Sequence, residues 1–546
     1  MAHSSKISQS SVLVAESSPI VIANIKILLR EIGFSDRLIH IAKDVRSIVS
    51  LAKKTRIDTI ICDYHFDERR NGKQIIEELR ENNFIQMSCS IVMLTADTSG
   101  GVVKSILDLD PDEYLVKPYS LFELKRRVAR TYKRKQEMSH LYQLSKNATV
   151  KEIQQAFDSA LDLMPDYTGH IHRLKGYTLV KRGDYAAAAR HYHQCLRKQP
   201  RHWAICGLAE SLIALNELDQ AESMIQSWLS SGKTKTPKIY ELLAMISARK
   251  GDLAGVHEQL TQAVDLTKGA HETLLARAVV NEMLLMPEKA IKDYQSYMHQ
   301  SVTTFKDGLL LPITMLRLKL MVVESNRKAN LEKIRNEALS LAKTEFREEE
   351  RLALMLVQLH IDVLEEDHKG IRSKLTQLIK NYQTLGAAYT GYLMYLLHLT
   401  HNYQLFDKLY KRYEKGVKKH HDLLSICTHR WIEQLNDRRK ERYASLKRVE
   451  KYISRQKNTN QSSTIGIALE LARSRQLCQR SASTFINLAD EIGCGDASLA
   501  ELRNVITSGE KVMVYGMELT ALERKEALHS LKRIKVMFNQ RVAACA

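Results

Sequence analysis

The sequence predicts a multidomain protein, with an α/β domain at its amino end and a long all-α region after it. Short apolar runs alternate with helical patterns up to about residue 132, which is typical of a sheet covered by helices. After Tyr132 only helical patterns remain, and no proline follows Pro312. Pro165, Pro200 and Pro237 recur about every 35 residues, which indicates a helical repeat.

Five apolar runs rich in β-branched residues are the predicted strands of the first domain. They are Ser11–Ala15, Leu38–Ala42, Ile57–Cys62, Ser90–Leu94 and Tyr114–Val116. Helical spacing predicts helices over 20–32 and 45–54, through Ile75 and Leu79, and over 121–132. The last of these helices continues past Arg134 without a Gly/Pro linker, so we expect a stiff connection to the all-α region.

Polar residues stand where four of these runs end: Glu16, Asp63, Thr95 and Lys117. Because the carboxyl ends of parallel strands meet at one sheet edge, we expect these side chains to converge. The set suits phosphoryl transfer to the Asp63 carboxylate, with Lys117 and the Thr95 hydroxyl contacting phosphoryl oxygens. Glu16 and Asp63 could hold Mg²⁺, which prefers oxygen ligands.

Four motifs occur in the order Leu-Val-Ala-Glu16, Ile-Ile-Cys-Asp63, Met-Leu-Thr95-Ala96 and Glu-Tyr114-Leu-Val-Lys117-Pro118. Together they resemble the receiver domain of two-component response regulators. The resemblance covers residues 10–132 and implies a doubly wound five-stranded parallel sheet. It implies that Asp63 accepts a phosphoryl group from a histidine kinase or phosphotransfer protein, and that Thr95 and Tyr114 then shift inward together. The main-chain carbonyl of His65 would complete the metal site, and the helix 4, strand 5 and helix 5 face would change partners or form a homodimer.

Two features depart from the family pattern. Ser17 stands where the family usually has a second acid that touches the metal, so Mg²⁺ binding and phosphorylation should be weakened. The loop 64–72 lacks the usual proline and is one residue longer, and its Asp67 is either a solvated acid or a substitute ligand. The sequence therefore leaves two alternatives, a receiver phosphorylated on Asp63 and a degenerate receiver locked in one state.

Residues 133–300 are the predicted helical repeats. The segment between Pro165 and Pro200 resembles the tetratricopeptide repeat, in which small Gly176 and Ala188 let two helices approach and Tyr192 fills their interface. Gly183 would turn the chain between the two helices, and weaker units lie before and after this one. We expect residues 301–546 to form a divergent helical-repeat extension, with an exposed loop at 458–464.

Such a solenoid leaves one face free for a protein or peptide, so we expect output by protein binding rather than by catalysis. The layout is similar to the VieB-like group of bacterial regulators. That similarity implies a partner from the same phosphorelay, such as a sensor kinase or a second regulator.

The formal net charge of +19 and two basic runs at 408–419 and 438–451 leave a nucleic-acid-binding regulator as an alternative. No recognisable DNA-binding motif accompanies the runs, so we do not expect a nucleic acid partner. A second alternative is a scaffold that works without phosphorylation.

The sequence predicts a cytoplasmic protein without a structural metal site in its helices. Its eight cysteines form no C-x-x-C pair, and no uncharged apolar run is long enough to span a membrane. Four histidines gather at positions 170, 172, 191 and 193, but their alternate spacing on helices predicts that they point in different directions. Tyrosines 382, 389, 392 and 395 are expected to line the core or the groove.

Overall fold

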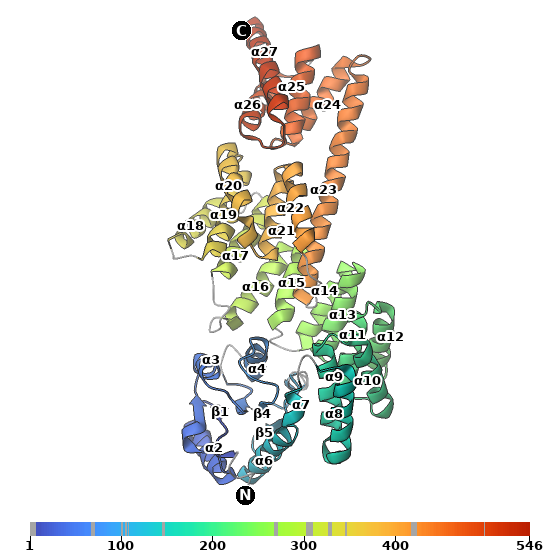
Figure 1. Ribbon diagram of the computed structural model, residues 1–546. Coiled ribbons are helices and arrows are strands. Elements are labelled where there is room, and N and C mark those ends of the chain that lie inside the picture. The colour runs from blue at the N-terminus through green and yellow to red at the C-terminus, as the bar shows by residue number, and fades with distance from the viewer. Residues whose placement is uncertain are drawn as a thin grey trace. The chain divides into compact units, whose positions relative to one another are not determined.

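The computed structural model describes most of the chain (Figure 1). The chain consists of two compact units. The described residues are 7–66, 71–99, 102–103, 106, 109–144, 148–266, 271–301, 309–325, 330–343, 347–416, 423–495 and 497–545. One unit is Met1–Leu285 with Lys292–Gly308, and the other is Met286–Ile291 with Leu309–Ala546.

A five-stranded, fully parallel sheet forms the centre of the amino-terminal domain. Its strands are β1 (Val12–Ala15), β2 (Ile39–Ala42), β3 (Thr59–Asp63), β4 (Ser90–Thr95) and β5 (Glu113–Val116), in the order β2-β1-β3-β4-β5. The order reverses between β1 and β3, and Ala15 pairs there with Cys62. Glu16 and Asp63 therefore stand side by side at the topological switch point, where open α/β sheets bind ligands.

Helices cover both faces of this sheet, as the alternation in the sequence predicts. Helices α2 (Pro19–Ile32) and α6 (Leu121–Glu137) bury apolar side chains against Val12 and Val14 on one face. Helices α3 (Val45–Lys54) and α4 (Gly72–Glu81) do the same against Leu13 and Ala15 on the other face. The doubly wound α/β fold is thus confirmed, with strand ends within about two residues of the predicted ones.

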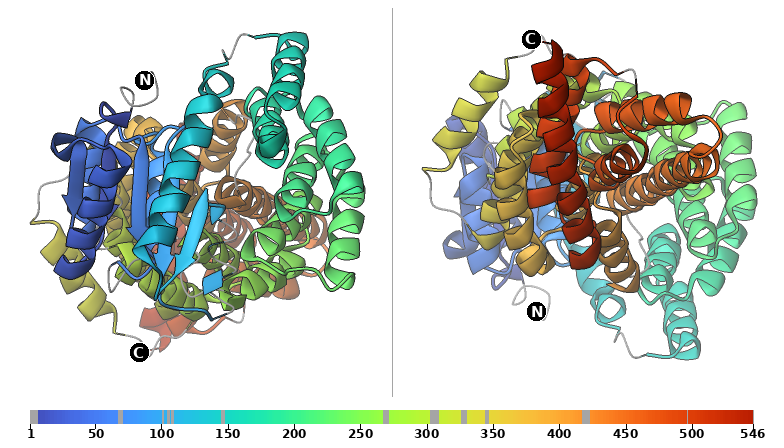
Figure 2. Two further views of the ribbon diagram at one scale, coloured as in Figure 1. Left: turned by 90° about the horizontal axis from the view of Figure 1, so that it is seen from below. Right: turned by 90° about the horizontal axis from the view of Figure 1, so that it is seen from above.

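The chain passes from the α/β domain into the helical region through buried residues. Helix α6 ends at Glu137, and the short α7 (Ser139–Tyr142) follows at once. Met138 and Leu141 are buried in the same apolar core as residues of the next helices. Figure 2 (left) shows α6 lying between the sheet and these helices.

A series of helices follows within the first unit. They are α8 (Val150–Leu163), α9 (Thr168–Lys181), α10 (Tyr185–Lys198), α11 (His202–Ala214), α12 (Leu218–Ser230), α13 (Pro237–Lys250), α14 (Leu253–Leu266) and α15 (His271–Met283). Helix α16 (Pro287–Ser301) comes next, and its residues are divided between the two units. Helix α11 contacts both α9 and α13, so alternate helices form one layer, as in a solenoid.

The Tyr192 side chain sets the spacing of the first helices. A Cβ atom on Gly176 would lie 2.4 Å from Tyr192 Cζ, and one on Gly207 would lie 2.3 Å from the same atom. The sequence predicted that Gly176 and Tyr192 meet, while the role of Gly207 was missed. Gly183, with φ of 81°, turns the chain between α9 and α10 as expected.

The second unit contains further helix pairs and then a separate bundle. Its helices are α17 (Leu310–Ser325), α18 (Leu331–Leu341), α19 (Glu348–Leu364), α20 (His368–Asn381), α21 (Ala387–Leu399), α22 (Tyr403–Gly416), α23 (Leu423–Gln456), α24 (Gln461–Ser474), α25 (Gln479–Ile492), α26 (Leu499–Tyr515) and α27 (Ala521–Cys545). The paired arrangement ends at α23, a helix of 34 residues whose second half packs with α24–α27 (Figure 2, right).

The predicted loop at 458–464 is wrong in its second half. Asn460 caps α24 by accepting a hydrogen bond from Ser463 N, so residues 461–464 form the first helical turn. Polar residues at a helix start are typical of a cap as well as of a loop, and the sequence pattern alone does not separate the two.

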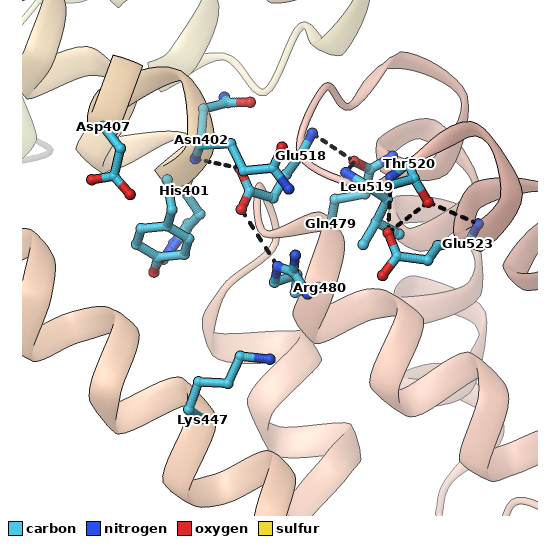
Figure 3. A network of polar contacts seen from close by, with 12 residues as sticks. His401, Asn402, Asp407, Lys447, Gln479, Arg480, Glu518, Leu519, Thr520 and Glu523 are labelled. Carbon is cyan, nitrogen blue, oxygen red and sulfur yellow. Dashed lines mark hydrogen bonds and ion pairs between the residues drawn. The ribbon is translucent and has the colours of Figure 1, made fainter. Parts of the chain in front are cut away.

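A buried polar network joins the bundle to α22 within the second unit (Figure 3). The Glu518 carboxylate, which is 4% exposed, accepts hydrogen bonds from Gln404 N at 3.0 Å and Arg480 Nε at 3.4 Å. Gln479 Oε1 accepts from the backbone nitrogens of Glu518 and Leu519. Burial raises the pKa of Glu518 despite these partners. The segment between α26 and α27 is therefore held by two side chains of α25 and by a backbone amide of α22.

Buried histidines near this network should make the second unit sensitive to acid. Burial and then Arg442 lower the pKa of His398 to about 4 and hold that of His401 well below its ordinary value. Both are neutral in the folded state, so their stabilisation is complete above the unfolded pKa near 6.5 and is lost as the pH falls toward 4. Hydrogen exchange of α21 amides at pH 7.5 and pH 5.0 should show an opening free energy about 1–2 kcal/mol lower at pH 5.0.

The double variant His398→Gln and His401→Gln should lose much of that pH dependence. His529→Gln is the control, because His529 is exposed on α27, and it should behave as the wild type. If the opening free energy of α21 depends on pH equally in the double variant and the wild type, other groups control the acid response.

Candidate functional site

Three charged side chains meet at the carboxyl edge of the sheet. Lys117 Nζ lies 2.7 Å from Asp63 Oδ2 and 2.9 Å from Glu16 Oε2, so one ammonium is shared by two carboxylates. Glu16 is 2% exposed, and the three groups together carry one net negative charge. Burial lowers the pKa of Lys117, but the hydrogen bonds to Asp63 and Glu16 outweigh burial and raise it above its usual value. Of the four residues predicted to converge, the structure brings Glu16, Asp63 and Lys117 into direct contact.

Backbone amides fix the orientation of both carboxylates. Glu16 Oε1 accepts hydrogen bonds from Ser17 N at 2.9 Å and Ser18 N at 3.0 Å, at the start of α2. Asp63 Oδ1 accepts from His65 N at 3.2 Å. Each carboxylate therefore has one oxygen held by the backbone and its other oxygen on Lys117, which orients the pair rigidly.

The threonine of the predicted switch is buried on the strand next to Asp63, whereas its tyrosine is exposed. Thr95 is 1% exposed at the end of β4, and its hydroxyl accepts from Asp97 N at 3.0 Å in its own loop. Leu94 is the register partner of Asp63, so Thr95 lies one residue further along the neighbouring strand. Tyr114 on β5 is 40% exposed. An inward shift of Tyr114 would thus be a change from the state described here.

The donor set at this edge fits a small hard cation. Glu16 and Asp63 supply carboxylate oxygens, and the main chain of His65 lies in the turn next to Asp63. Mg²⁺ takes few protein oxygens and keeps several waters, so two carboxylates with a net negative charge suit it. Ser17 is exposed and adds no carboxylate, and Asp67 lies outside the described residues.

Gly72 lets the first turn of α4 pack directly on Asp63. Its amide donates to Tyr64 O at 2.7 Å, and Asn71 caps the helix through Gln74 N. A Cβ atom on Gly72 would lie 2.6 Å from Asp63 O and 2.9 Å from Cys62 Sγ. Only glycine therefore fits at position 72, and its close contact fixes the backbone of Asp63.

Gly72→Ala should lower the opening free energy of β3 by about 1–3 kcal/mol, because the added methyl group overlaps backbone that cannot move freely. Hydrogen exchange of the β3 amides measures the effect. Gly169→Ala in α9 is the control, because open space surrounds Gly169, and it should leave β3 unchanged. Wild-type protection of β3 in Gly72→Ala would mean that α4 adjusts without strain.

Ionic contacts connect the α/β domain to the first helices, and the sequence did not reveal them. Arg134 of α6, which is 4% exposed, lies 2.6 Å from Asp112 Oδ1 and 2.9 Å from His170 Nε2 of α9. Arg173 of α9 pairs with Asp110. Asp112 also accepts a hydrogen bond from Ile91 N of β4. The loop before β5 is therefore bonded to the sheet on one side and to α9 on the other.

The basic runs near the carboxyl end make several contacts within the chain. Arg439 pairs with Asp407 and lies 5.5 Å from the centre of the Tyr443 ring. Arg442 lies 3.2 Å from His398, and burial lowers its pKa. Cations held in this way are poorly placed to contact phosphates. Residues 417–419 of the first run lie outside the described part.

Two of the predicted core tyrosines are indeed interior. Tyr389 is buried and Tyr392 is fully buried, and Arg317 lies 5.3 Å from the centre of the Tyr392 ring. In the part of the chain that the structure describes, no helix has the length and apolarity needed to cross a bilayer.

Comparison with protein families matches two parts of the chain. Residues 12–129 match the response regulator receiver domain, and residues 179–246 match the tetratricopeptide repeat. The amino-terminal domain is therefore a receiver domain, and helices α10–α13 include a tetratricopeptide-type repeat.

Several solved structures are similar to the receiver domain. The chemotaxis response regulator CheY4 of Vibrio cholerae is 24% identical, with 22% of this chain and 98% of that chain covered and a TM-score of 0.20. The receiver domain of the Francisella response regulator 1452 is 28% identical, with 23% and 98% covered and a TM-score of 0.20. Comparison with curated proteins finds no match.

Proposed function

We propose that this chain is a two-component response regulator that is phosphorylated on Asp63 and acts by binding another protein through its helical repeats. The observation that carries the proposal is the Lys117 ammonium shared by Asp63 and Glu16, inside a receiver domain that continues into tetratricopeptide-type helices. A carboxylate nucleophile needs such a fixed positive charge, since it would otherwise repel the incoming phosphoryl oxygens.

In the proposed reaction an Asp63 carboxylate oxygen attacks phosphorus, and the bond from phosphorus to the donor histidine nitrogen breaks. Lys117 then pairs with a phosphoryl oxygen instead of with the free Asp63 carboxylate. The Thr95 hydroxyl lies at the end of the neighbouring strand and would donate to another phosphoryl oxygen. Glu16, Asp63 and the His65 carbonyl would hold Mg²⁺, which neutralises charge on the phosphoryl group when bound.

The phosphorylated state would reach the repeats through the loop before β5. Thr95 and Val116 are register partners, so a shift at the end of β4 bears directly on β5. The preceding residues Asp110 and Asp112 hold Arg173 and Arg134. Inward movement of Tyr114 would change this loop and, through the Arg173 ion pair, the position of α9.

Arg173→Ala should uncouple the repeats while leaving phosphorylation of Asp63 at its wild-type rate. In the wild type, phosphorylation should change the hydrogen exchange of α9, and the variant should lose more than half of that change. Arg197→Ala is the control, because Arg197 is exposed at the end of α10. An undiminished change in α9 in the Arg173→Ala variant would place the coupling elsewhere.

The partner we propose is a protein of the same phosphorelay, as the VieB-like layout implies. Crosslinking capture with the full chain, before and after phosphorylation, tests this proposal against an Asp63→Ala variant. A captured protein whose yield changes on phosphorylation of the wild type, and not in the variant, supports the switch. Equal capture in all arms would favour the alternative of a scaffold that works without phosphorylation.

Nucleic acid recovered with the chain tests the alternative of a nucleic-acid-binding regulator. Retention of nonspecific DNA or RNA that falls steeply with added salt would favour it. We expect little such retention, because Arg439 and Arg442 are engaged inside the chain.

Self-association of the receiver is a further part of the proposal. Exposed apolar side chains lie on β5 and at the start of α6: Tyr114, Val116, Leu121 and Phe122. Such side chains suit a patch that pairs with a second receiver after phosphorylation.

A further inference from the structure

Two histidines and a cysteine meet between helices α9 and α10. His191 and Cys195 lie one turn apart on α10, and His172 lies on the neighbouring α9. One ligand atom from each residue lies within 4.8 Å of the other two. Cys195 Sγ is 3.6 Å from His191 Nε2, and the two imidazole centres are 5.4 Å apart. The prediction that these histidines point in different directions is wrong for this pair, while His170 contacts Arg134 and His193 is exposed.

We propose that His172, His191 and Cys195 form a binding site for a divalent zinc-type ion. Imidazole and thiolate are the ligands that zinc prefers, whereas Mg²⁺ and Ca²⁺ prefer oxygen. Tetrahedral zinc holds such ligand atoms roughly 3.5 Å apart, so small side-chain rotations would bring this set to its distances. Three protein ligands leave a fourth position for water or another ligand.

Zinc binds neutral imidazole and thiolate, so a bound ion would displace the proton of the Cys195 thiol.

A plain hydrogen bond between helices explains only part of the cluster. His191 Nε2 donates a hydrogen bond to the His172 carbonyl oxygen at 2.8 Å, and an ion bound by this nitrogen would replace that hydrogen bond. His172 Nδ1 is buried and has no hydrogen-bond partner among the residues that the structure describes, and Cys195 contributes a half-buried thiol beside the imidazole of His191. An ion would use donor atoms from all three residues, which the hydrogen bond does not.

A bound ion would connect α9 to α10 next to the receiver. His172 is flanked on α9 by His170 and Arg173, which contact Arg134 and Asp110. The ion would therefore brace the helix that meets the receiver, whether or not Asp63 is phosphorylated. The proposal thus stands independently of the proposed function.

The test is titration of the chelator-treated full chain with Co²⁺ and then Zn²⁺. We expect one cobalt ion to bind with the absorption of a cobalt–thiolate bond and to be displaced by zinc. Cys195→Ser should abolish the thiolate absorption, and both Cys195→Ser and His172→Gln should weaken zinc binding at least about 10-fold.

Matched controls come from the same region. Cys206→Ser removes a thiol that lies 3.5 Å from His202 Nε2 one turn away on α11, and His193→Gln removes an exposed histidine of α10. Neither control should change cobalt absorption or zinc affinity. A wild-type chain that binds no zinc at micromolar concentration, or unchanged binding in Cys195→Ser and His172→Gln, would overturn the proposal.

Alkylation of the wild type gives a readout that does not depend on the folding of a variant. Zinc should protect Cys195 from iodoacetamide, as measured by mass spectrometry of its peptide, while leaving Cys494 as reactive as before. Alkylation of Cys195 at the same rate with and without zinc would also overturn the proposal.

Discussion

Lys117→Met should reduce the rate of phosphate incorporation at Asp63 by at least about 100-fold, since removal of one fixed charge at a transferred group typically costs that much. Lys117 Nζ lies within 3 Å of both carboxylates, at 2.7 Å from Asp63 and 2.9 Å from Glu16. Without the ammonium, the two acids and an incoming phosphoryl group would repel one another. Intact mass after incubation with a small acyl phosphate and Mg²⁺ measures the incorporation.

Two further variants complete this experiment. Lys125→Met removes an exposed lysine paired with Glu31 and should incorporate phosphate at the wild-type rate. Asp63→Asn should incorporate none. A wild type that gains no phosphate would identify a degenerate receiver, which is the alternative suggested by the serine at position 17. Phosphate incorporation in Lys117→Met at the wild-type rate would contradict the proposed role of the ammonium.

Gly207→Val should lower the opening free energy of α9–α11 by about 3 kcal/mol, near the upper end for an overpacked core. The Tyr192 ring touches both Gly176 and Gly207, and even a Cβ atom on Gly207 would lie 2.3 Å from Tyr192 Cζ. Valine would force either the ring or α11 away from its position. Hydrogen exchange of the α9–α11 amides gives the measurement.

A double variant separates overlap with the ring from a general defect. Gly207→Val combined with Tyr192→Leu should recover part of the loss, because the smaller side chain leaves room, and the two effects should be non-additive. Gly169→Val adds the same side chain to α9 where open space surrounds it, and should cost well under 1 kcal/mol beyond helix propensity. Additive losses in the double variant would show that the ring is not the obstacle.

The sequence alone determined the features that repeat locally or lie at fixed places along a strand. Alternation of apolar runs and helical patterns predicted the five strands, because a buried parallel strand must be apolar throughout its length. The convergence of Glu16, Asp63 and Lys117 followed from the geometry of parallel strands, whose carboxyl ends meet at one edge. Gly176 and Tyr192 were found because they lie within one repeat of known period.

The tertiary structure alone decided which distant residues meet. Arg173 reaches Asp110 across 63 positions of the chain, and no periodicity links them. His172 meets His191 and Cys195 because two helices pack at one distance and rotation, whereas spacing on each helix suggested divergence. Patterns along the chain report which side of an element is buried. Only packing, through the volumes of residues such as Gly207 and Tyr192, decides which side chains face one another there.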